Sequence, residues 1–328
     1  MEARIASAPQ AAERGALGLS LGSESVALDR LVLDWWLTSG VRRERDLLPW
    51  RSVKDPWLVL LAEVMLTQTQ AARVAQRYGA FVSRFPSAPA MARAPVADVL
   101  RSWSGLGYNG RAVRLHAAAS LITERHGGEV PARLDALVAL PGIGPYCARA
   151  VLAFGFGIEA APVDTNIGRV LARAVAGSRL RAGEAQRLAD SLVPAGDARC
   201  WSLALMDLGA SLCVAREPRC SSCPIGAAGA CAWRAAIAAA PVRDRGADPA
   251  DPARGTAAAS RRQGRFEGSD RQGRGRLLRR ACDGPIRPEQ LAAAAGWQAD
   301  PDRATRIAAD LVAEGLASRD EHGGLRLG

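Results

Sequence analysis

The sequence contains almost no lysine and no long apolar run. Of its 43 basic residues only Lys54 is a lysine, and the others are arginines. No stretch reaches the roughly 18 apolar residues of a membrane span, and residues 1–25 contain no apolar signal core. We therefore expect a cytoplasmic protein that has no membrane partner.

The 328 residues carry a formal net charge of +10 at pH 7. A positive excess favours a polyanionic partner such as nucleic acid. Ala, Arg and Gly are abundant throughout, so a compositional bias could also produce this charge. The charge alone therefore leaves nucleic-acid binding open.

The chain length predicts two or three domains, and the composition changes along the chain at three places. Residues 1–25 show no hydrophobic period and are expected to be a disordered tail. Residues 26–236 contain successive helical patterns without strand alternation, which predicts an all-α core. Residues 237–266 lack large apolar side chains and predict a linker. Three helical patterns and a Gly-Gly hairpin in residues 267–328 predict a winged-helix-like α+β domain, with a helical appendage as the alternative.

Four of the seven cysteines lie close together in the pattern C-x6-C-x2-C-x7-C: Cys213, Cys220, Cys223 and Cys231. Cysteine thiolates at such spacing bind zinc or an iron–sulfur cluster. No histidine is nearby, so all four ligands would be sulfur. One close pair flanked by two wider loops favours a [4Fe-4S] cluster over zinc. The other three cysteines are isolated and are expected to be buried packing residues.

Residues 140–146 (LPGIGPY) separate two apolar helical patterns and predict a hairpin between two helices. Gly142 and Gly144 would let the backbone turn tightly and approach a ligand. The amide groups at the start of the second helix would then bind a phosphate, which positions DNA without reading its sequence. Arg216 and Arg219, inside the first cysteine loop, are further candidates for phosphate contact. A plain helix–helix turn and a solvated loop are the alternatives.

Two carboxylates follow or interrupt apolar segments. Glu63 is the one charged residue in residues 58–66, where burial would raise its pKa and keep it protonated near neutral pH. The alternative is a glutamate on a solvent-facing side of the helix. Asp164 precedes another helix and could be only its N-cap. One protonated and one ionised carboxylate would suit cleavage of a glycosidic bond through an oxocarbenium-like state.

Several short motifs occur together in one order. Over residues 30–235 the sequence resembles the helix-hairpin-helix DNA glycosylases that carry an iron–sulfur cluster, and among them the MutY-type adenine glycosylases. The motifs that carry the resemblance are LPWR (48–51), EVMLTQTQ (63–70), GLGY (105–108), LPGIGPY (140–146), VDTN (163–166), MDLGA (206–210) and the four cysteines.

This resemblance implies a two-lobed fold. A six-helix barrel lobe would comprise residues 56–162, and a cluster lobe would comprise residues 26–55 and 163–236. The implied activity is base excision repair by a monomer associated with the nucleoid. Its partner would be double-stranded DNA with a mismatched or oxidised base pair, from which adenine opposite 8-oxoguanine or guanine is flipped into a pocket.

The resemblance also implies roles for individual residues. Glu63 would protonate N7 of adenine, and Asp164 would stay ionised and stabilise the sugar cation. Tyr146 and Asn166 would support the two acids by hydrogen bonds. Gln68, Thr69 and Tyr108 would probe and wedge the base stack, and the hairpin would hold a backbone phosphate. The full set of expected DNA contacts outside the cysteine loop is Arg51, Gln68, Thr69, Tyr108, Gly142, Ile143 and Gly144.

A related class of glycosylase, the endonuclease III type, cuts the DNA strand with a lysine of the hairpin. Tyr146 occupies that position here, and Lys54 lies upstream of the Glu63 helix. A Schiff-base lyase would need a substitute such as an N-terminal amine. We therefore expect a monofunctional glycosylase.

Three departures from the family pattern keep alternatives open. Thr67 replaces the first of two usual glutamines, the last cysteine loop has seven residues instead of five, and no β-rich domain for 8-oxoguanine follows the core. A thymine or uracil mismatch glycosylase on the same scaffold is the close alternative. A non-catalytic iron–sulfur DNA-binding protein or regulator is a distant one, because both acids, Tyr146 and Asn166 occur together.

Overall fold

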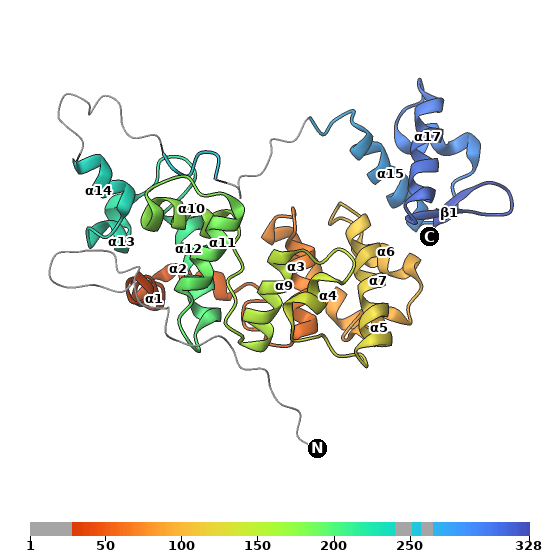
Figure 1. The fold of residues 1–328 in the computed structure, drawn as a ribbon. Helices are drawn as coiled ribbons and strands as arrows, with labels where there is room; N and C mark the ends of the chain where they lie inside the picture. Colours follow the sequence, from red (N-terminus) through yellow and green to blue (C-terminus); the bar gives the residue numbers. More distant parts are fainter. Residues whose placement is uncertain (1–27, 240–250, 257–264) are drawn as a thin grey trace, which may run out of the picture. The chain divides into compact units, whose positions relative to one another are not determined.

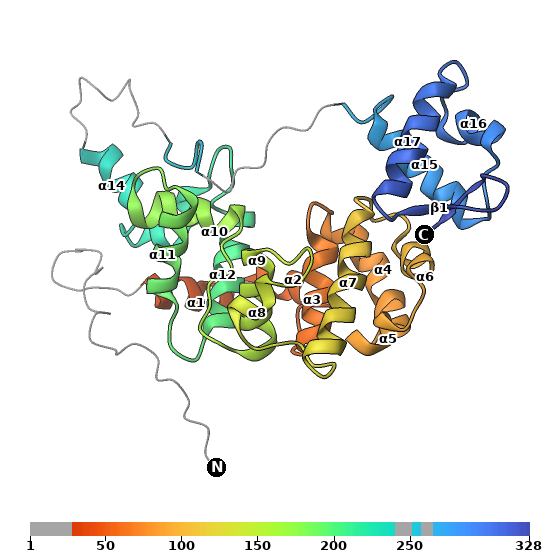
Figure 2. The same ribbon diagram turned by 45° about the vertical axis from the view of Figure 1, so that its right-hand side comes forward.

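The structure is a computed structural model that describes residues 28–239, 251–256 and 265–328 (Figures 1 and 2). The predicted tail, 1–25, lies outside these residues, as does most of the predicted linker. The chain divides into two compact units, one made of Met1–Glu44 and Glu159–Ser260, the other of Arg45–Ile158 and Arg261–Gly328. No described residue before Ile286 belongs to a strand or bridge, as expected of an all-α core.

The first unit is built around helix α12 (Ala198–Ser211). Its helices are α1 (Leu28–Thr38), α10 (Thr165–Val170), η3 (Leu171–Ala176), α11 (Ala182–Leu192), α12 (Ala198–Ser211), η4 (Cys220–Ser222), α13 (Pro224–Ala227) and α14 (Ala232–Ala239). α12 packs against both α1 and α10. The indole of Trp36 on α1 donates a 2.9 Å hydrogen bond to the buried carboxylate of Asp207 on α12. This bond joins the start of the described chain to the centre of the unit.

The first helix that lies wholly in the second unit, α3 (Pro56–Leu66), is apolar on nearly every side. Its core helices are α3 (Pro56–Leu66), α4 (Ala71–Arg84), α5 (Ala88–Ala92), α6 (Val96–Trp103), α7 (Gly110–Arg125), α8 (Leu134–Val138), α9 (Pro145–Ala150) and η2 (Val151–Phe156), while α2 (Gly40–Asp46) precedes them. α3 packs against α4, α9 and η2. A Cβ atom on Gly155 of η2 would lie 2.9 Å from the Cα of Pro56. The close approach of η2 to the start of α3 therefore requires glycine.

The C-terminal part of the second unit has three helical segments and a hairpin. They are α15 (Asp270–Cys282), η6 (Pro288–Gln290) with α16 (Leu291–Ala295), α17 (Pro301–Ala313), β1 (Ala317–Arg319) and β2 (Leu325–Leu327). β1 and β2 are antiparallel, and Ile286 adds a bridge to Leu325. Leu277, Ile307 and Leu311 form part of the buried core. The expected order of helices and hairpin is confirmed, although the second helix is divided in two.

The described helices can be compared with the length and apolar character that a membrane span requires. None of them is both long and apolar enough to cross a bilayer.

Candidate active site and cysteine pocket

α3 places Glu63 inside the second unit. The carboxylate of Asp55 caps the helix by accepting a 2.9 Å hydrogen bond from the Leu58 amide, and Pro56 occupies the first turn. Seven apolar side chains of α3 are buried, and Glu63 is only 7% exposed. Glu63 is therefore not a solvent-facing glutamate, which was the alternative interpretation of the sequence.

The hairpin helix α9 brings a thiol close to this acid. Burial raises the pKa of Cys147 to about 12, and Glu63 adds to that rise at the alkaline pH where its carboxyl group is ionised. The hydroxyl of Thr67 donates to the carbonyl oxygen of Glu63 at 2.9 Å and lies 4.0 Å from Sγ of Cys147. Tyr146, the neighbour of Cys147, is half-buried. Glu63, Thr67 and Cys147 thus share one environment.

The expectation that the three isolated cysteines are buried is confirmed for Cys147 only. Cys200 and Cys282 are each partly exposed. Both lie near the ends of helices, Cys200 near the start of α12 and Cys282 as the last residue of α15, where fewer neighbouring side chains cover them.

Arg111 organises this part of the second unit and was not identified from the sequence. Its guanidinium is buried and donates hydrogen bonds of 2.6–3.3 Å to two groups of carbonyl oxygens. One group belongs to the end of α3 and the residue after it, and the other to the GLGY loop. The acceptors are the carbonyl oxygens of Val64, Met65, Thr67, Leu106 and Gly107 and the hydroxyl of Thr69. Arg111 is one arginine among many, and no pattern in the sequence distinguishes it.

The two loops that Arg111 joins carry backbone strain at the residues expected to wedge DNA. Gln68 has a φ of 56° and Tyr108 a φ of 48°, and residues other than glycine rarely adopt such backbone angles. Gln68 is exposed, and Tyr108 is 42% exposed. Thr69 donates to the carbonyl oxygen of Leu106 at 3.1 Å, so its hydroxyl ties one loop to the other.

The predicted hairpin forms between α8 and α9. Gly142 has a φ of +76°, and a Cβ atom there would lie 2.9 Å from Cβ of Arg114, so the turn requires glycine. Ile143 points its side chain into the core, whereas Gly144 is exposed and forms the N-cap of α9. The backbone of this turn, and not the Ile143 side chain, is therefore what the hairpin presents to a partner.

The second acid, Asp164, belongs to the first unit and caps α10. One carboxylate oxygen accepts hydrogen bonds from the amides of Asn166 and Ile167 at 2.9 and 2.7 Å. The other accepts from the side-chain amide of Asn166 at 2.7 Å. Burial raises the pKa of Asp164, and these three bonds act in the opposite direction. Burial thus opposes the ionised state expected for Asp164.

A chain of hydrogen bonds leads from Asp164 to the first cysteine of the cluster motif. Arg169 donates to the side-chain oxygen of Asn166 at 2.8 Å and to the carbonyl oxygen of Cys213 at 2.6 Å. It also donates to the carbonyl oxygen of Gly209 at 2.6 Å. A Cβ atom on Gly209 would lie 2.7 Å from Cβ of Asn166, so glycine is needed for this packing.

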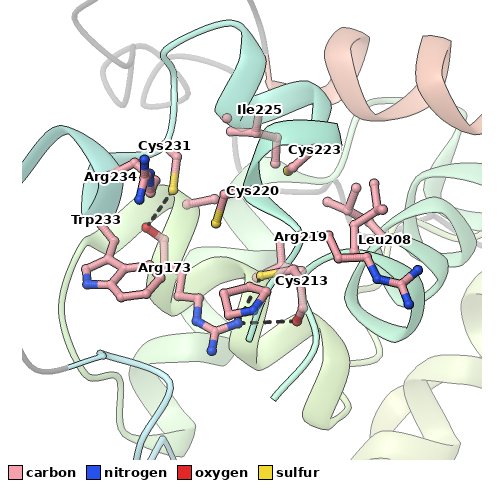
Figure 3. Close-up of a pocket in the computed structure, with 15 residues that line it drawn as sticks. Arg173, Leu208, Cys213, Arg219, Cys220, Cys223, Ile225, Cys231, Trp233 and Arg234 are labelled. Atoms are coloured by element: carbon pink, nitrogen blue, oxygen red, sulfur yellow. Dashed lines mark hydrogen bonds between the residues drawn. The ribbon is translucent and has the colours of Figure 1, made fainter. Parts of the chain in front are cut away.

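The four clustered cysteines line one pocket (Figure 3). Cys231 is buried and donates from its thiol to the carbonyl oxygen of Arg173 at 3.5 Å, while the other three are partly exposed. Leu208 and Ile225 contribute apolar walls. Burial raises the pKa of the Cys213, Cys223 and Cys231 thiols. Without a bound cation, these sulfurs would therefore remain thiols at neutral pH.

The four clustered cysteines give the pocket an all-sulfur set of candidate ligands. Within the described residues, no three His, Cys, Asp or Glu side chains are placed to hold one metal ion. Mononuclear zinc needs its four ligands on one centre, whereas in a [4Fe-4S] cluster each thiolate binds a different iron. Four thiols that line one pocket are a donor set that an iron–sulfur cluster accepts.

The three arginines predicted to contact DNA differ in exposure. Arg216 and Arg219 are exposed in the loop between Cys213 and Cys220, and Arg219 also lines the cysteine pocket. Arg51 is half-buried and follows Trp50, whose buried ring meets Tyr78 edge-on at 5.8 Å between centroids. Two of the three arginines are therefore freely accessible to a polyanion.

Comparisons with known proteins agree with these features. A family model described as HhH-GPD superfamily base excision DNA repair protein matches residues 61–195. The adenine DNA glycosylase of Mycobacterium tuberculosis is 40% identical over 314 residues, which cover 92% of this chain and 96% of that protein. A thymine/uracil-DNA glycosylase of Methanothermobacter thermautotrophicus is 34% identical over 58% of this chain and 87% of its own.

A solved structure supports the fold. A thermostable thymine-DNA glycosylase superimposes with a TM-score of 0.57 at 29% identity, covering 63% of this chain and 95% of its own. The mostly helical architecture therefore has the helix-hairpin-helix glycosylase fold. With the identity to the mycobacterial protein over nearly its whole length, the chain belongs to the MutY-type adenine DNA glycosylases of the helix-hairpin-helix superfamily.

Proposed function

We propose that the protein removes adenine paired with 8-oxoguanine or guanine from double-stranded DNA. The observation that carries this proposal is the contrast between two acids, one buried on an apolar helix and one held by three hydrogen bonds. The similarity to the mycobacterial adenine DNA glycosylase supports the choice of adenine, because it covers 92% of this chain. The thymine/uracil relative matches only 58%.

Glu63 is the general acid in this reaction. A carboxyl group that is 7% exposed on an apolar helix is costly to ionise, so it retains a proton to donate. It transfers this proton to N7 of the flipped adenine, which withdraws electrons from the glycosidic bond. The half-buried Tyr146 supports Glu63 from the start of α9.

Asp164 is the electrostatic partner in this reaction. When the bond between C1′ and the base breaks, the sugar becomes cationic, and a nearby cation favours the ionised form of a carboxyl group. The hydrogen bonds from Asn166 hold the carboxylate in one orientation for this role. Water then adds its oxygen to C1′ and passes a proton to the Glu63 carboxylate, which restores the general acid and leaves an abasic site and free adenine.

DNA is held by the hairpin and by two loops. The backbone of Gly142, Ile143 and Gly144 contacts a phosphate, as the exposed turn before α9 allows. Gln68 and Tyr108, exposed on their strained loops, enter the base stack beside the flipped nucleotide, and Thr69 fixes the loop that carries Gln68. Arg216 and Arg219 contact further phosphates.

The four cysteines would hold a [4Fe-4S] cluster. The cluster, when bound, supplies structural support to the loop between Cys213 and Cys220, which carries the two exposed arginines. Since Tyr146 stands in place of a hairpin lysine, the proposed enzyme releases the base without cutting the strand.

A panel of duplexes tests the proposed substrate. Purified protein is incubated with duplexes carrying A opposite 8-oxoguanine, A opposite G, T opposite G or U opposite G, and the products are treated with alkali. We expect alkali-dependent breaks at adenine only. Breaks only at T or U would contradict the adenine assignment, and breaks without alkali would contradict the monofunctional one.

Two variants test the acids. Glu63→Gln and Asp164→Asn should each nearly abolish adenine release while retaining DNA binding. Wild-type rates in either variant would remove that residue from the mechanism. Asp55→Asn serves as a matched control, because its carboxylate caps α3 without belonging to the proposed chemistry.

A thymine or uracil mismatch glycosylase is the second candidate. Thr67 favours it, since this residue replaces a glutamine usual in adenine glycosylases, and a thymine-DNA glycosylase is among the solved structures with the same fold. The same duplex panel decides between the two, because a preference for T or U opposite G would identify the second activity.

A further inference from the structure

Residues 251–256 form a short ordered turn on the first unit. Pro252 and Thr256 are buried, and the hydroxyl of Thr256 donates to the carbonyl oxygen of Pro252 at 2.7 Å. The carboxylate of Asp251 accepts a 3.0 Å hydrogen bond from the Ala253 amide. Arg179 donates to the carbonyl oxygen of Gly255 at 2.7 Å. We call these residues the 251–256 turn.

A bidentate ion pair between Arg173 and Asp251 is the strongest attachment of the 251–256 turn to the first unit. Arg173 on η3 donates from Nε and Nη2 to the two carboxylate oxygens of Asp251 at 2.8 and 2.6 Å. The side chains are 2% and 16% exposed. A bidentate pair in such a place is geometrically specific, and removal of one partner leaves a buried charge uncompensated.

The same guanidinium contacts the cysteine pocket. Nη1 of Arg173 donates to Sγ of Cys213 at 3.4 Å and to the carbonyl oxygen of Val214 at 2.7 Å. Its carbon centre lies 5.3 Å above the ring of Trp233, which also lines the pocket (Figure 3). Arg173 therefore connects the 251–256 turn to the first cysteine and to the wall beside the last one.

We propose that the 251–256 turn helps to hold the cluster. In this role Asp251 positions Arg173, and Arg173 donates a hydrogen bond to the Cys213 sulfur. This inference rests on the proposed [4Fe-4S] cluster. Hydrogen bonds to ligand sulfurs and exposure to solvent help to set the reduction potential of such clusters. Groups that orient metal ligands commonly change metal affinity 10–100-fold when they are removed. Asp251 and Arg173 are positioning residues, since the cysteines alone would bind iron.

The test uses the full-length, cluster-loaded protein with Asp251→Asn. The control is Asp135→Asn, which removes an equally bidentate pair with Arg133 whose side chains are 77% and 68% exposed. Two properties are measured: the rate at which visible absorbance is lost in air with a chelator, and the midpoint potential of the cluster. We expect about 10-fold faster loss for Asp251→Asn. Its potential should rise, because the positive charge of Arg173 is no longer neutralised. The control should match wild type.

A second variant separates positioning from folding. Arg179→Gln loosens the other end of the 251–256 turn without touching Arg173 or a cysteine. It should accelerate cluster loss by less than Asp251→Asn and leave the potential unchanged. If Asp251→Asn lowers the melting temperature but keeps the wild-type potential and rate of loss, the proposal is overturned. A colourless wild-type protein would instead overturn the cluster assignment itself.

Discussion

The guanidinium of Arg111 donates a hydrogen bond of 2.6 Å to the carbonyl oxygen of Thr67, the residue directly before the strained Gln68. The same side chain donates to the carbonyl oxygen of Gly107 at 2.9 Å, directly before the strained Tyr108. One buried cation thus fixes both residues that are proposed to enter the base stack. Strain of this kind persists only where the surrounding structure enforces it.

Arg111→Met should therefore impair both folding and base release. Five carbonyl oxygens would lose a donor, and an unsatisfied buried acceptor costs about 1–3 kcal/mol. We expect a loss of at least about 3 kcal/mol in the free energy of unfolding, measured by urea denaturation. Arg111→Lys keeps the charge but lacks the planar fork, so it should recover only part of the loss. If Arg111→Lys has the same free energy of unfolding as wild type, the planar guanidinium is not required.

Gln68→Gly should separate stability from activity. Glycine adopts a φ of 56° without strain, so the lost strain offsets the entropy that glycine adds to the unfolded chain. We expect the free energy of unfolding to change by less than about 1 kcal/mol. Release of adenine under single-turnover conditions should nevertheless slow at least tenfold, because the probing side chain is gone.

Gln70→Gly is the matched control for this variant. Gln70 precedes α4 with an ordinary φ of −63°, so glycine relieves no strain there and should destabilise the fold slightly without slowing base release. If Gln68→Gly releases adenine as fast as Gln70→Gly does, Gln68 does not take part in recognition.

Asn166→Ala should slow the chemistry and leave DNA binding intact. The variant removes the 2.7 Å hydrogen bond to Asp164 and separates Arg169 from the acid. A hydrogen bond to a charged group contributes about 1.5–3 kcal/mol, which corresponds to a rate about 10–100-fold lower. Single-turnover release and equilibrium binding of an uncleavable duplex measure the two effects. Weakened binding with an unchanged rate would place Asn166 in DNA contact instead.

The sequence predicted those features that depend on periodicity and on motif spacing. The apolar run around Glu63 predicted a helix but left the burial of Glu63 open, Asp55 and Pro56 marked the start of this helix, and the glycines of the hairpin marked its turn. The spacing of the four cysteines predicted that they share one site, and all four line one pocket. In each case the information lies within a few neighbouring residues.

The sequence did not predict the arginines that connect distant segments. Many contacts of Arg111, Arg169 and Arg173 are with carbonyl oxygens, which every residue possesses and which therefore leave no trace in the sequence. Arg169 and Arg173 are four residues apart on one helical stretch, a spacing that could have suggested a shared face. The partner of Arg173, Asp251, lies in a segment whose composition resembles a linker, so only its place in the fold identifies it.

The buried thiol of Cys147 should make stability depend on alkaline pH. Its pKa is about 12 in the folded protein and 9.0 in the unfolded chain, so the unfolded state loses its proton first. The contribution of Cys147 to the free energy of unfolding is therefore fully present below pH 9, and it is lost as the pH rises toward 12. Urea denaturation at pH 8, 9 and 10 should show a steeper fall in unfolding free energy for wild type than for Cys147→Val. Equal slopes would mean that the thiol is as accessible in the folded protein as in the unfolded chain.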